Sequence, residues 1–176
     1  DIKKGLLTAR LAGRLQQISL KPNIVLDVAH NGAAALALAK SISQRKQKRQ
    51  RIFVLFGLLS DKEMEEVIRP FIGLVDGWYV TALPSDRAQT PTVLADKIQA
   101  LGGKVTGCFD CIEAAWKSVL TQVSDDDKIV VFGSFVLIGE IVSMPDFGLS
   151  ALQEERASVL TRKKEQVIDI DRLLKR

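Results

Sequence analysis

The sequence predicts a three-layer α/β fold in which helices cover both faces of a mostly parallel, Rossmann-like sheet. Short apolar runs such as residues 52–57 and 128–132 do not alternate between polar and apolar side chains, which is typical of strands buried on both faces. Segments with helical periodicity separate these runs at a spacing that indicates right-handed βαβ units. The length of 176 residues and the hydrophobic content of 47% suit one domain, or one domain with a tail.

The expected strands are short runs of β-branched and aromatic residues. In chain order they are 14–19, which alternates and is expected at a sheet edge, then 23–28, 52–57, 77–81, a short strand at Val105, and 128–132. The expected helices between and after them are 33–43, about 61–72, 92–101, 110–122 and 135–143. The α/β domain is therefore predicted to cover residues 12–145, with a helical or mobile extension at 146–176 that has no strand pattern.

Composition and charge narrow the class of protein. No apolar run approaches the roughly 18 residues of a membrane span and no signal peptide is visible, so the chain is expected to be cytoplasmic without a membrane partner. A basic run lies at 45–51, where aromatic residues are missing; a solvated turn is therefore favoured over a nucleic-acid patch. Cys108 and Cys111 are too few for a zinc site and are expected to be structural, with Cys111 packing at the start of a helix.

Ligands of an open parallel sheet bind at the carboxyl ends of its strands. The segments that follow the predicted strands are polar or contain glycine, and we expect them to meet on one rim of the sheet. They are residues 29–32, 58–63, 82–90 and 133–135.

Four residues at this rim are candidates for binding. Asp27, at the end of a buried strand, either accepts the hydroxyls of a ribose or caps a helix or pairs with an arginine. His30, the only histidine, precedes a predicted helix N-terminus, which attracts anions, although a lone histidine is more often structural. Asn31 is a candidate N-cap, and Ser134 is either an N-cap or a ligand for a carboxylate or phosphate.

Several familiar motifs are missing. The sequence has no G-x-G-x-x-G fingerprint of a dinucleotide-binding domain and no G-x-x-x-x-G-K-[ST] loop for a triphosphate. No cluster of carboxylates indicates a metal site, and no nucleophile–histidine motif is present. Because the chain also begins at Asp1 without an initiator methionine, we expect it to be part of a longer protein.

Four motifs occur in an order and spacing that resemble a known family. They are G-R-L-Q at 13–16, D-V-A-H-N at 27–31, G-L-L-S-D-K-E at 57–63 and F-G-S-F at 132–135, with Phe109-Asp110 and Ala114-Ala115-Trp116 in the interval before the last. Together they resemble the C-terminal domain of folylpolyglutamate synthases and dihydrofolate synthases, which belong to the Mur ligase superfamily. The resemblance covers about residues 12–145.

The resemblance implies an ATP-dependent ligase that joins L-glutamate to a folate or dihydropteroate carboxylate through an acyl phosphate. It implies that an N-terminal catalytic domain, absent from this chain, carries the P-loop, most of the folate site and the main Mg²⁺ ligands. The isolated C-terminal domain is then expected to be inactive. By the same resemblance, Arg14, Asp27 and Asn31 bind the nucleotide and His30 is catalytic. Ser134, Asp61 and Lys62 bind substrate.

The sequence departs from the family pattern at two positions, and its tail from about Leu149 runs past the usual end of the domain. Gly32 stands where the family often has proline, and Glu63 where it usually has aspartate. Two alternatives also remain open: another amide ligase of the Mur superfamily, or a non-catalytic module that binds a partner through its basic loop and helical tail.

Overall fold

The computed structural model describes residues 15–149. In this range six strands form one sheet in the order β1-β2-β6-β3-β4-β5. The strands are β1 (Gln16–Leu20), β2 (Asn23–Leu26), β3 (Ile52–Phe56), β4 (Gly77–Thr81), β5 (Val105–Phe109) and β6 (Lys128–Phe132). Only the edge strand β1 runs antiparallel to its neighbour, and the other pairings are parallel.

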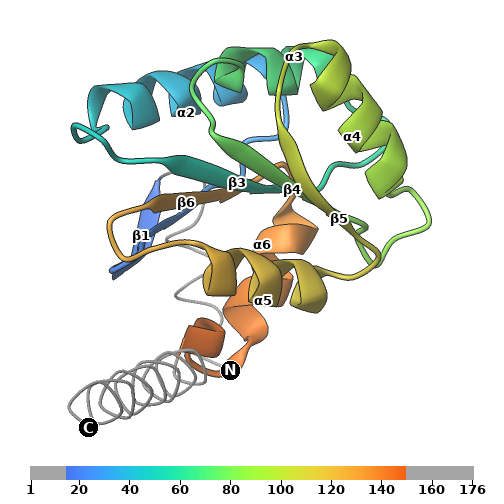
Figure 1. Ribbon diagram of the computed structural model, residues 1–176. Coiled ribbons are helices and arrows are strands. Elements are labelled where there is room, and N and C mark those ends of the chain that lie inside the picture. Colours follow the sequence, from blue (N-terminus) through green and yellow to red (C-terminus); the bar gives the residue numbers. More distant parts are fainter. Residues whose placement is uncertain (1–14, 150–176) are drawn as a thin grey trace, which may run out of the picture. The chain divides into compact units, whose positions relative to one another are not determined.

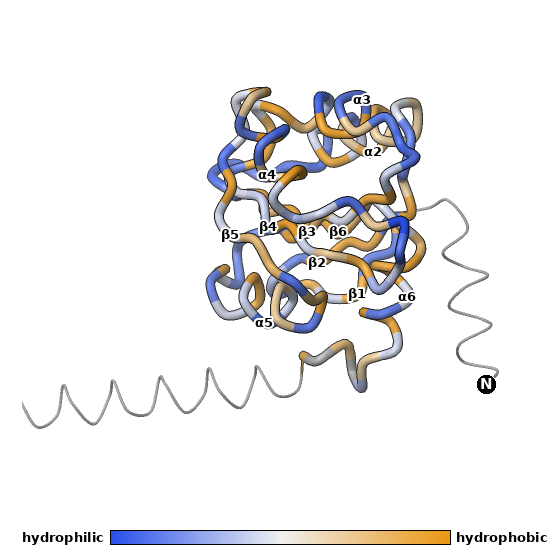
Figure 2. Tube along the Cα trace, turned by 90° about the vertical axis from the view of Figure 1, so that its right-hand side faces the viewer, coloured by the Kyte–Doolittle hydropathy of each residue, from blue (hydrophilic) through white to orange (hydrophobic). Residues whose placement is uncertain are grey.

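Helices cover both faces of this sheet (Figure 1). On one face lie α2 (Gly32–Gln44), α3 (Met64–Ile68) with the 3-10 turn η1 (Arg69–Phe71), and α4 (Pro91–Ala100). On the other face lie α5 (Ile112–Gln122) and α6 (Phe135–Ser143). The strands between them form an apolar layer (Figure 2), and β4 and β6 are buried at every position. The predicted fold class is confirmed.

The order of the strands creates a switch in the direction of the connections. Strand β6 lies between β2 and β3. The helices that follow β2 and β3 lie on one face, whereas α6, which follows β6, lies on the other (Figure 1). Adjacent strands whose connections leave toward opposite faces open a crevice at their carboxyl ends, where such folds bind ligands. The loops after β2, β3 and β6 meet at this point.

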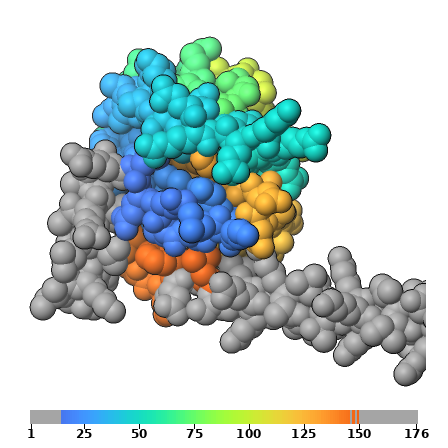
Figure 3. Space-filling view, turned by 90° about the vertical axis from the view of Figure 1, so that its left-hand side faces the viewer, coloured from blue at the N-terminus to red at the C-terminus, as the bar shows by residue number. Residues whose placement is uncertain are grey.

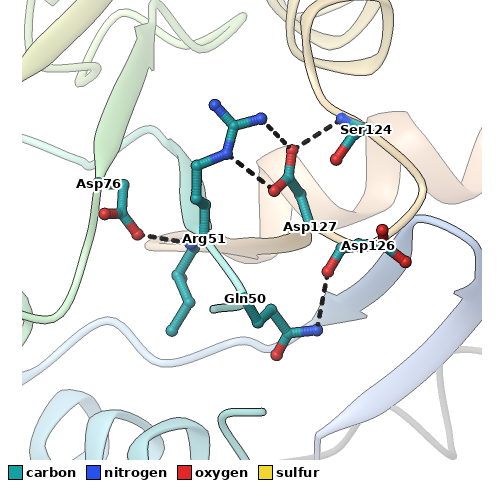
Figure 4. Close-up of polar contacts among 7 residues, drawn as sticks. Gln50, Arg51, Asp76, Ser124, Asp126 and Asp127 are labelled. Atoms are coloured by element: carbon teal, nitrogen blue, oxygen red, sulfur yellow. Dashed lines mark hydrogen bonds and ion pairs between the residues drawn. The ribbon is translucent and has the colours of Figure 1, made fainter. Parts of the chain in front are cut away.

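The opposite, amino edge of the sheet is held by a polar network (Figure 4). The Arg51 guanidinium donates to both carboxylate oxygens of Asp127, at 3.0 and 2.7 Å, and the Ser124 backbone N–H donates to the same carboxylate at 2.7 Å. The Asp76 carboxylate accepts from Ile52 N–H at 2.8 Å. Burial would raise the pKa of Asp127, but the hydrogen bonds from Arg51 and Ser124 outweigh it and hold the pKa below its ordinary value.

Several predicted elements need adjustment. The strand predicted at 14–19 is present at the sheet edge as β1, but it spans Gln16–Leu20, and residue 14 lies outside the described residues. The predicted helix 61–72 is shorter at both ends, because Lys62 N–H closes a turn with the Leu59 carbonyl before α3 and Pro70 lacks the N–H that would continue the α-helix. The packing expected for Cys111 is wrong: it is the N-cap of α5, before the apolar face begins, and both cysteines are exposed and free.

The exposed basic residues Arg45, Lys46, Lys48 and Arg49 lie in the connection between α2 and β3, as expected for a solvated turn.

The chain divides into two compact units, Asp1–Ser143 and Met144–Arg176. Of the second unit the structure describes only the beginning, with a 3-10 turn at Pro145–Gly148, so the extension predicted at 146–176 stays a prediction. Across residues 15–149, no helix is long and apolar enough to cross a membrane.

Candidate functional site

Asp27 lies directly after β2 and is almost fully buried, with 8% of its surface exposed. Its Oδ1 accepts a hydrogen bond from Ala29 N–H at 2.8 Å. Within residues 15–149 the Asp27 carboxylate takes part in no ion pair. Burial raises the pKa of Asp27, and the Ala29 N–H only partly offsets this effect. The carboxylate thus has acceptor capacity that the described protein leaves unused.

His30 follows on the same loop and is half-buried. Its Nδ1 lies 2.9 Å from the Val28 carbonyl oxygen. Because a carbonyl oxygen can only accept, Nδ1 carries a proton, and Nε2 is the nitrogen left for a ligand. The His30 ring also contacts the Phe135 ring, with centroids 5.7 Å apart and planes inclined by 52°.

Asn31 is the N-cap of α2, as the sequence predicts: its Oδ1 accepts from Ala34 N–H at 2.9 Å. The side-chain oxygen of Asn31 is therefore engaged in holding the helix start. A contact between Asn31 and a nucleotide stays a prediction.

The loop after β6 approaches the loop after β3 very closely. Gly133 has a φ of +119°, and a Cβ on it would lie 2.3 Å from the Gly57 carbonyl oxygen, so no other residue fits this position without a shift of backbone. The next residue, Ser134, is 4% exposed, and its Oγ accepts from Val136 N–H at 3.1 Å. Ser134 thus caps α6, and no acceptor within residues 15–149 engages its hydroxyl proton.

Asp61 and Lys62 lie on the loop after β3, away from Asp27 and His30 in the chain. They form an ion pair with each other at 3.4 Å. Their loop is joined to the loop after β4 by an isolated bridge between Leu59 and Ala88. The two loops that the sequence placed on the same rim are therefore in direct contact.

A hollow of about 750 Å³ runs along one side of α2. Ala34, Ala37 and Ser41 recur at helical spacing on that side, and their small side chains leave the space open. The lining is completed by residues of the β2–α2 loop, α2 and the start of α6: Leu15, Asp27, Val28, Ala29, His30, Leu38, Arg45 and Phe135. Figure 3 shows this side of the molecule, where α2 lies above the β1–β2 hairpin.

The structure brings two of the predicted site residues, Asp27 and His30, into one hollow. Ser134 lies next to a lining residue but does not line the hollow itself, and neither do Asp61 and Lys62. Arg14 lies outside the described residues.

Among the other lining residues, Phe135 and Arg45 can extend into the hollow from its ends, and the sequence predicts no role for either at this site. Phe135 belongs to the F-G-S-F motif and directly follows Ser134, and its side chain is exposed. Arg45 was assigned only to the basic run, although it ends the helix that borders the hollow.

A comparison with protein families identifies the domain. Residues 13–135 match the family model described as "Mur ligase, glutamate ligase domain". This chain belongs to the Mur ligase family. The match includes the whole sheet and all of the loops at its carboxyl edge, and it ends at Phe135.

Curated relatives of this Mur ligase domain are longer proteins. Over 145 residues the chain is 32% identical to the dihydrofolate synthase/folylpolyglutamate synthase of Buchnera aphidicola subsp. Schizaphis graminum, covering 82% of this chain and 34% of that protein. It is also 30% identical over 145 residues to the Escherichia coli protein of the same name, covering 82% of this chain and 33% of that protein. The chain spans about a third of the length of the curated relatives it matches.

Solved structures agree with this assignment. Escherichia coli FolC in complex with DHPP and ADP matches with a TM-score of 0.68 and 25% identity, over 83% of this chain and 32% of that one. A bifunctional folylpolyglutamate synthase/dihydrofolate synthase with Mn, AMPPNP and L-glutamate bound matches with a TM-score of 0.65 and 28% identity, over 76% of this chain and 31% of that one. Residues 15–149 contain no group of three or more His, Cys, Asp or Glu side chains that could hold such a metal.

Proposed function

We propose that this chain is the C-terminal domain of an ATP-dependent ligase that joins L-glutamate to a folate or dihydropteroate carboxylate through an acyl phosphate. Its part is to contact the ribose and phosphates of ATP and the incoming glutamate, at a cleft with a second domain. The observation that carries this proposal is the meeting of Asp27 and His30 in one hollow, at the end of it that lies at the carboxyl edge of the sheet, beside the Ser134 loop.

Asp27 suits the ribose of ATP. It is buried, has one backbone donor and takes part in no ion pair with a described residue. Two ribose hydroxyls would supply the donors that a buried carboxylate requires, as the acidic residue of a dinucleotide-binding domain does. The relatives reported above with ADP or AMPPNP bound support an adenine nucleotide as a ligand of the whole enzyme.

His30 suits the reaction centre. With Nδ1–H held by the Val28 carbonyl, a neutral ring offers Nε2 as an acceptor, which can take a proton from the glutamate ammonium group before it attacks. A protonated ring offers Nε2–H to the transferring phosphate, where negative charge builds up. Either use requires that Nε2 face the substrates, which the bond at Nδ1 favours.

The metal belongs elsewhere in this proposal. When bound, Mg²⁺ would neutralise part of the charge of the ATP phosphates. Because residues 15–149 hold no candidate cluster, we assign the metal ligands and the P-loop to an N-terminal domain, and we expect the chain alone to be inactive. Ser134, Asp61 and Lys62 would contact glutamate from the two adjoining loops.

The test is ATP-dependent incorporation of labelled L-glutamate into dihydropteroate and into tetrahydrofolate. It would compare the 176-residue chain with a protein in which the P-loop domain of a folylpolyglutamate synthase precedes it. We expect ligation and stoichiometric ADP release only with the two-domain protein. Ligation by the chain alone would refute the division of labour. Activity with another carboxylate acceptor but with neither folate would indicate a different Mur-superfamily ligase.

A further inference from the structure

The imidazole of His30 is held at two points. The first is the hydrogen bond from Nδ1–H to the Val28 carbonyl oxygen at 2.9 Å. One hydrogen bond fixes a point on the ring but leaves rotation about the bond. The second point is Phe135, whose ring lies against the imidazole within the 4.5–7 Å centroid range of favourable aromatic pairs, at 5.7 Å.

Phe135 is conspicuous because it is 57% exposed at the rim of a site whose other apolar lining residues are mostly small or buried. Single exposed apolar residues are common and by themselves indicate nothing. Phe135, however, is fixed by its backbone: Gly133 admits no side chain beside the Gly57 carbonyl, and Ser134 caps the helix that Phe135 begins. The ring is therefore presented to His30 from a rigid support.

We propose that Phe135 is a positioning residue for His30: it restricts rotation of the imidazole so that Nε2 faces the hollow. The role in turnover rests on the proposed function, whereas the contact itself does not. Holding a catalytic group in one orientation lowers the entropic part of the barrier, and a small misplacement of such a group slows the reaction. Because the ring is placed at an open rim, one face of Phe135 stays exposed.

The contact can be tested without any activity. His30 is the only histidine of the 176-residue chain, so its ring signals in a proton–nitrogen and proton–carbon NMR spectrum are unambiguous. Phe135→Leu keeps an apolar side chain but removes the ring, and Phe135→Tyr keeps the ring. Leu36→Ala, at another exposed apolar residue (46%), is the matched control.

We expect a single Nδ1-protonated form in the original chain, in Phe135→Tyr and in Leu36→Ala. In Phe135→Leu the ring-current shift of the His30 Cε1–H disappears and its signals broaden or report a mixture of tautomers. Unchanged His30 signals in Phe135→Leu would overturn the proposal. Melting curves establish that each variant is folded, as expected for a residue exposed to this degree.

The consequence for catalysis is tested in the two-domain protein. Phe135→Leu should lower kcat about 2- to 10-fold, the range of an aromatic contact of this kind, and leave the KM for ATP unchanged. Phe135→Tyr should restore kcat. A changed NMR spectrum with an unchanged kcat would overturn the positioning role. If the two-domain protein ligates no folate at all, the proposed function fails, and the NMR result still decides whether Phe135 orients His30.

Discussion

Two buried carboxylates lie at opposite edges of the same sheet, and their surroundings differ. Asp127, at the amino edge, is 3% exposed and receives two hydrogen bonds from Arg51 and one from Ser124 N–H (Figure 4). Asp27, at the carboxyl edge, is 8% exposed and, among the described residues, receives one hydrogen bond, from Ala29 N–H. The pKa of Asp127 is lowered and that of Asp27 is raised. The described residues therefore satisfy the hydrogen-bonding capacity of the Asp127 carboxylate more completely than that of the Asp27 carboxylate.

This difference separates residues that stabilise the sheet from residues that are available to bind a ligand. A buried carboxylate with too few hydrogen-bond donors is destabilising, and such a group is often found where a ligand or reaction uses it. The glycine with positive φ at the carboxyl edge, Gly133, fits the same division, because its close approach to Gly57 shapes the rim. Substitutions at the carboxyl edge should therefore impair activity, whereas substitutions at the amino edge should lower stability.

The largest effect is expected for His30→Ala in the two-domain protein. Loss of a group that acts on the transferring phosphate or the attacking amine should lower kcat on the order of 100-fold, with little change in the KM for ATP. A transition-state contact lowers kcat and kcat/KM together. Steady-state kinetics and a melting curve on the same preparation check this. A normal kcat with a lowered melting temperature would show that His30 stabilises the fold and takes no part in catalysis.

Asp27→Ala should act on the nucleotide. Loss of hydrogen bonds to the ribose corresponds to about 1–3 kcal/mol, or roughly a 5- to 150-fold rise in the KM for ATP. The KM for folate should change less. Kinetics with ATP and folate varied separately would measure both. An unchanged KM for ATP together with lower thermal stability would assign Asp27 to the fold.

At the amino edge, Asp127→Asn should lower stability and leave kinetics unchanged. The variant loses the charge-assisted bonds to Arg51, but Arg51 is half-exposed and is readily solvated, so the loss is about 1–2 kcal/mol. Urea unfolding measures it. Asp126→Asn is the matched control, because its side chain is exposed and only its backbone carbonyl contacts Gln50. An equal loss in both variants would mean that the network does not stabilise the sheet.

The two edges also differ in how far the sequence predicts them. The positions of Asp27 and His30 at the carboxyl edge could be predicted because both lie on the short loop that follows the apolar strand β2, and position relative to a strand can be read locally. The Arg51–Asp127 pair could not, since it joins segments 76 residues apart that become neighbours only when β6 inserts between β3 and β2. The same holds for the contact between His30 and Phe135. The early end of α3 and the exposure of Cys111 depended on local details, a proline and a capping position, that hydrophobic periodicity does not resolve.

The smallest effect, and the one that tests the comparison most directly, is the pH dependence of stability. For Asp27 the folded pKa is raised above the ordinary value of 3.8, so its contribution to stability is fully present below that value and is lost as the pH rises through the folded pKa. For Asp127 the folded pKa is lowered, so its contribution is present above 3.8 and is lost as the pH falls through the folded pKa.

Asparagine imitates the protonated carboxyl and can still accept from Ala29 N–H. Asp27→Asn should therefore be more stable than the original chain at neutral pH and equal to it in acid, whereas Asp127→Asn should be less stable at neutral pH and approach it in acid. Urea unfolding of the three proteins from roughly pH 3 to 8 gives both curves, and the two differences should have opposite signs. If Asp27→Asn were instead less stable at neutral pH, the Asp27 carboxylate would have a cationic partner in the folded protein, and its availability to a ribose would be lost.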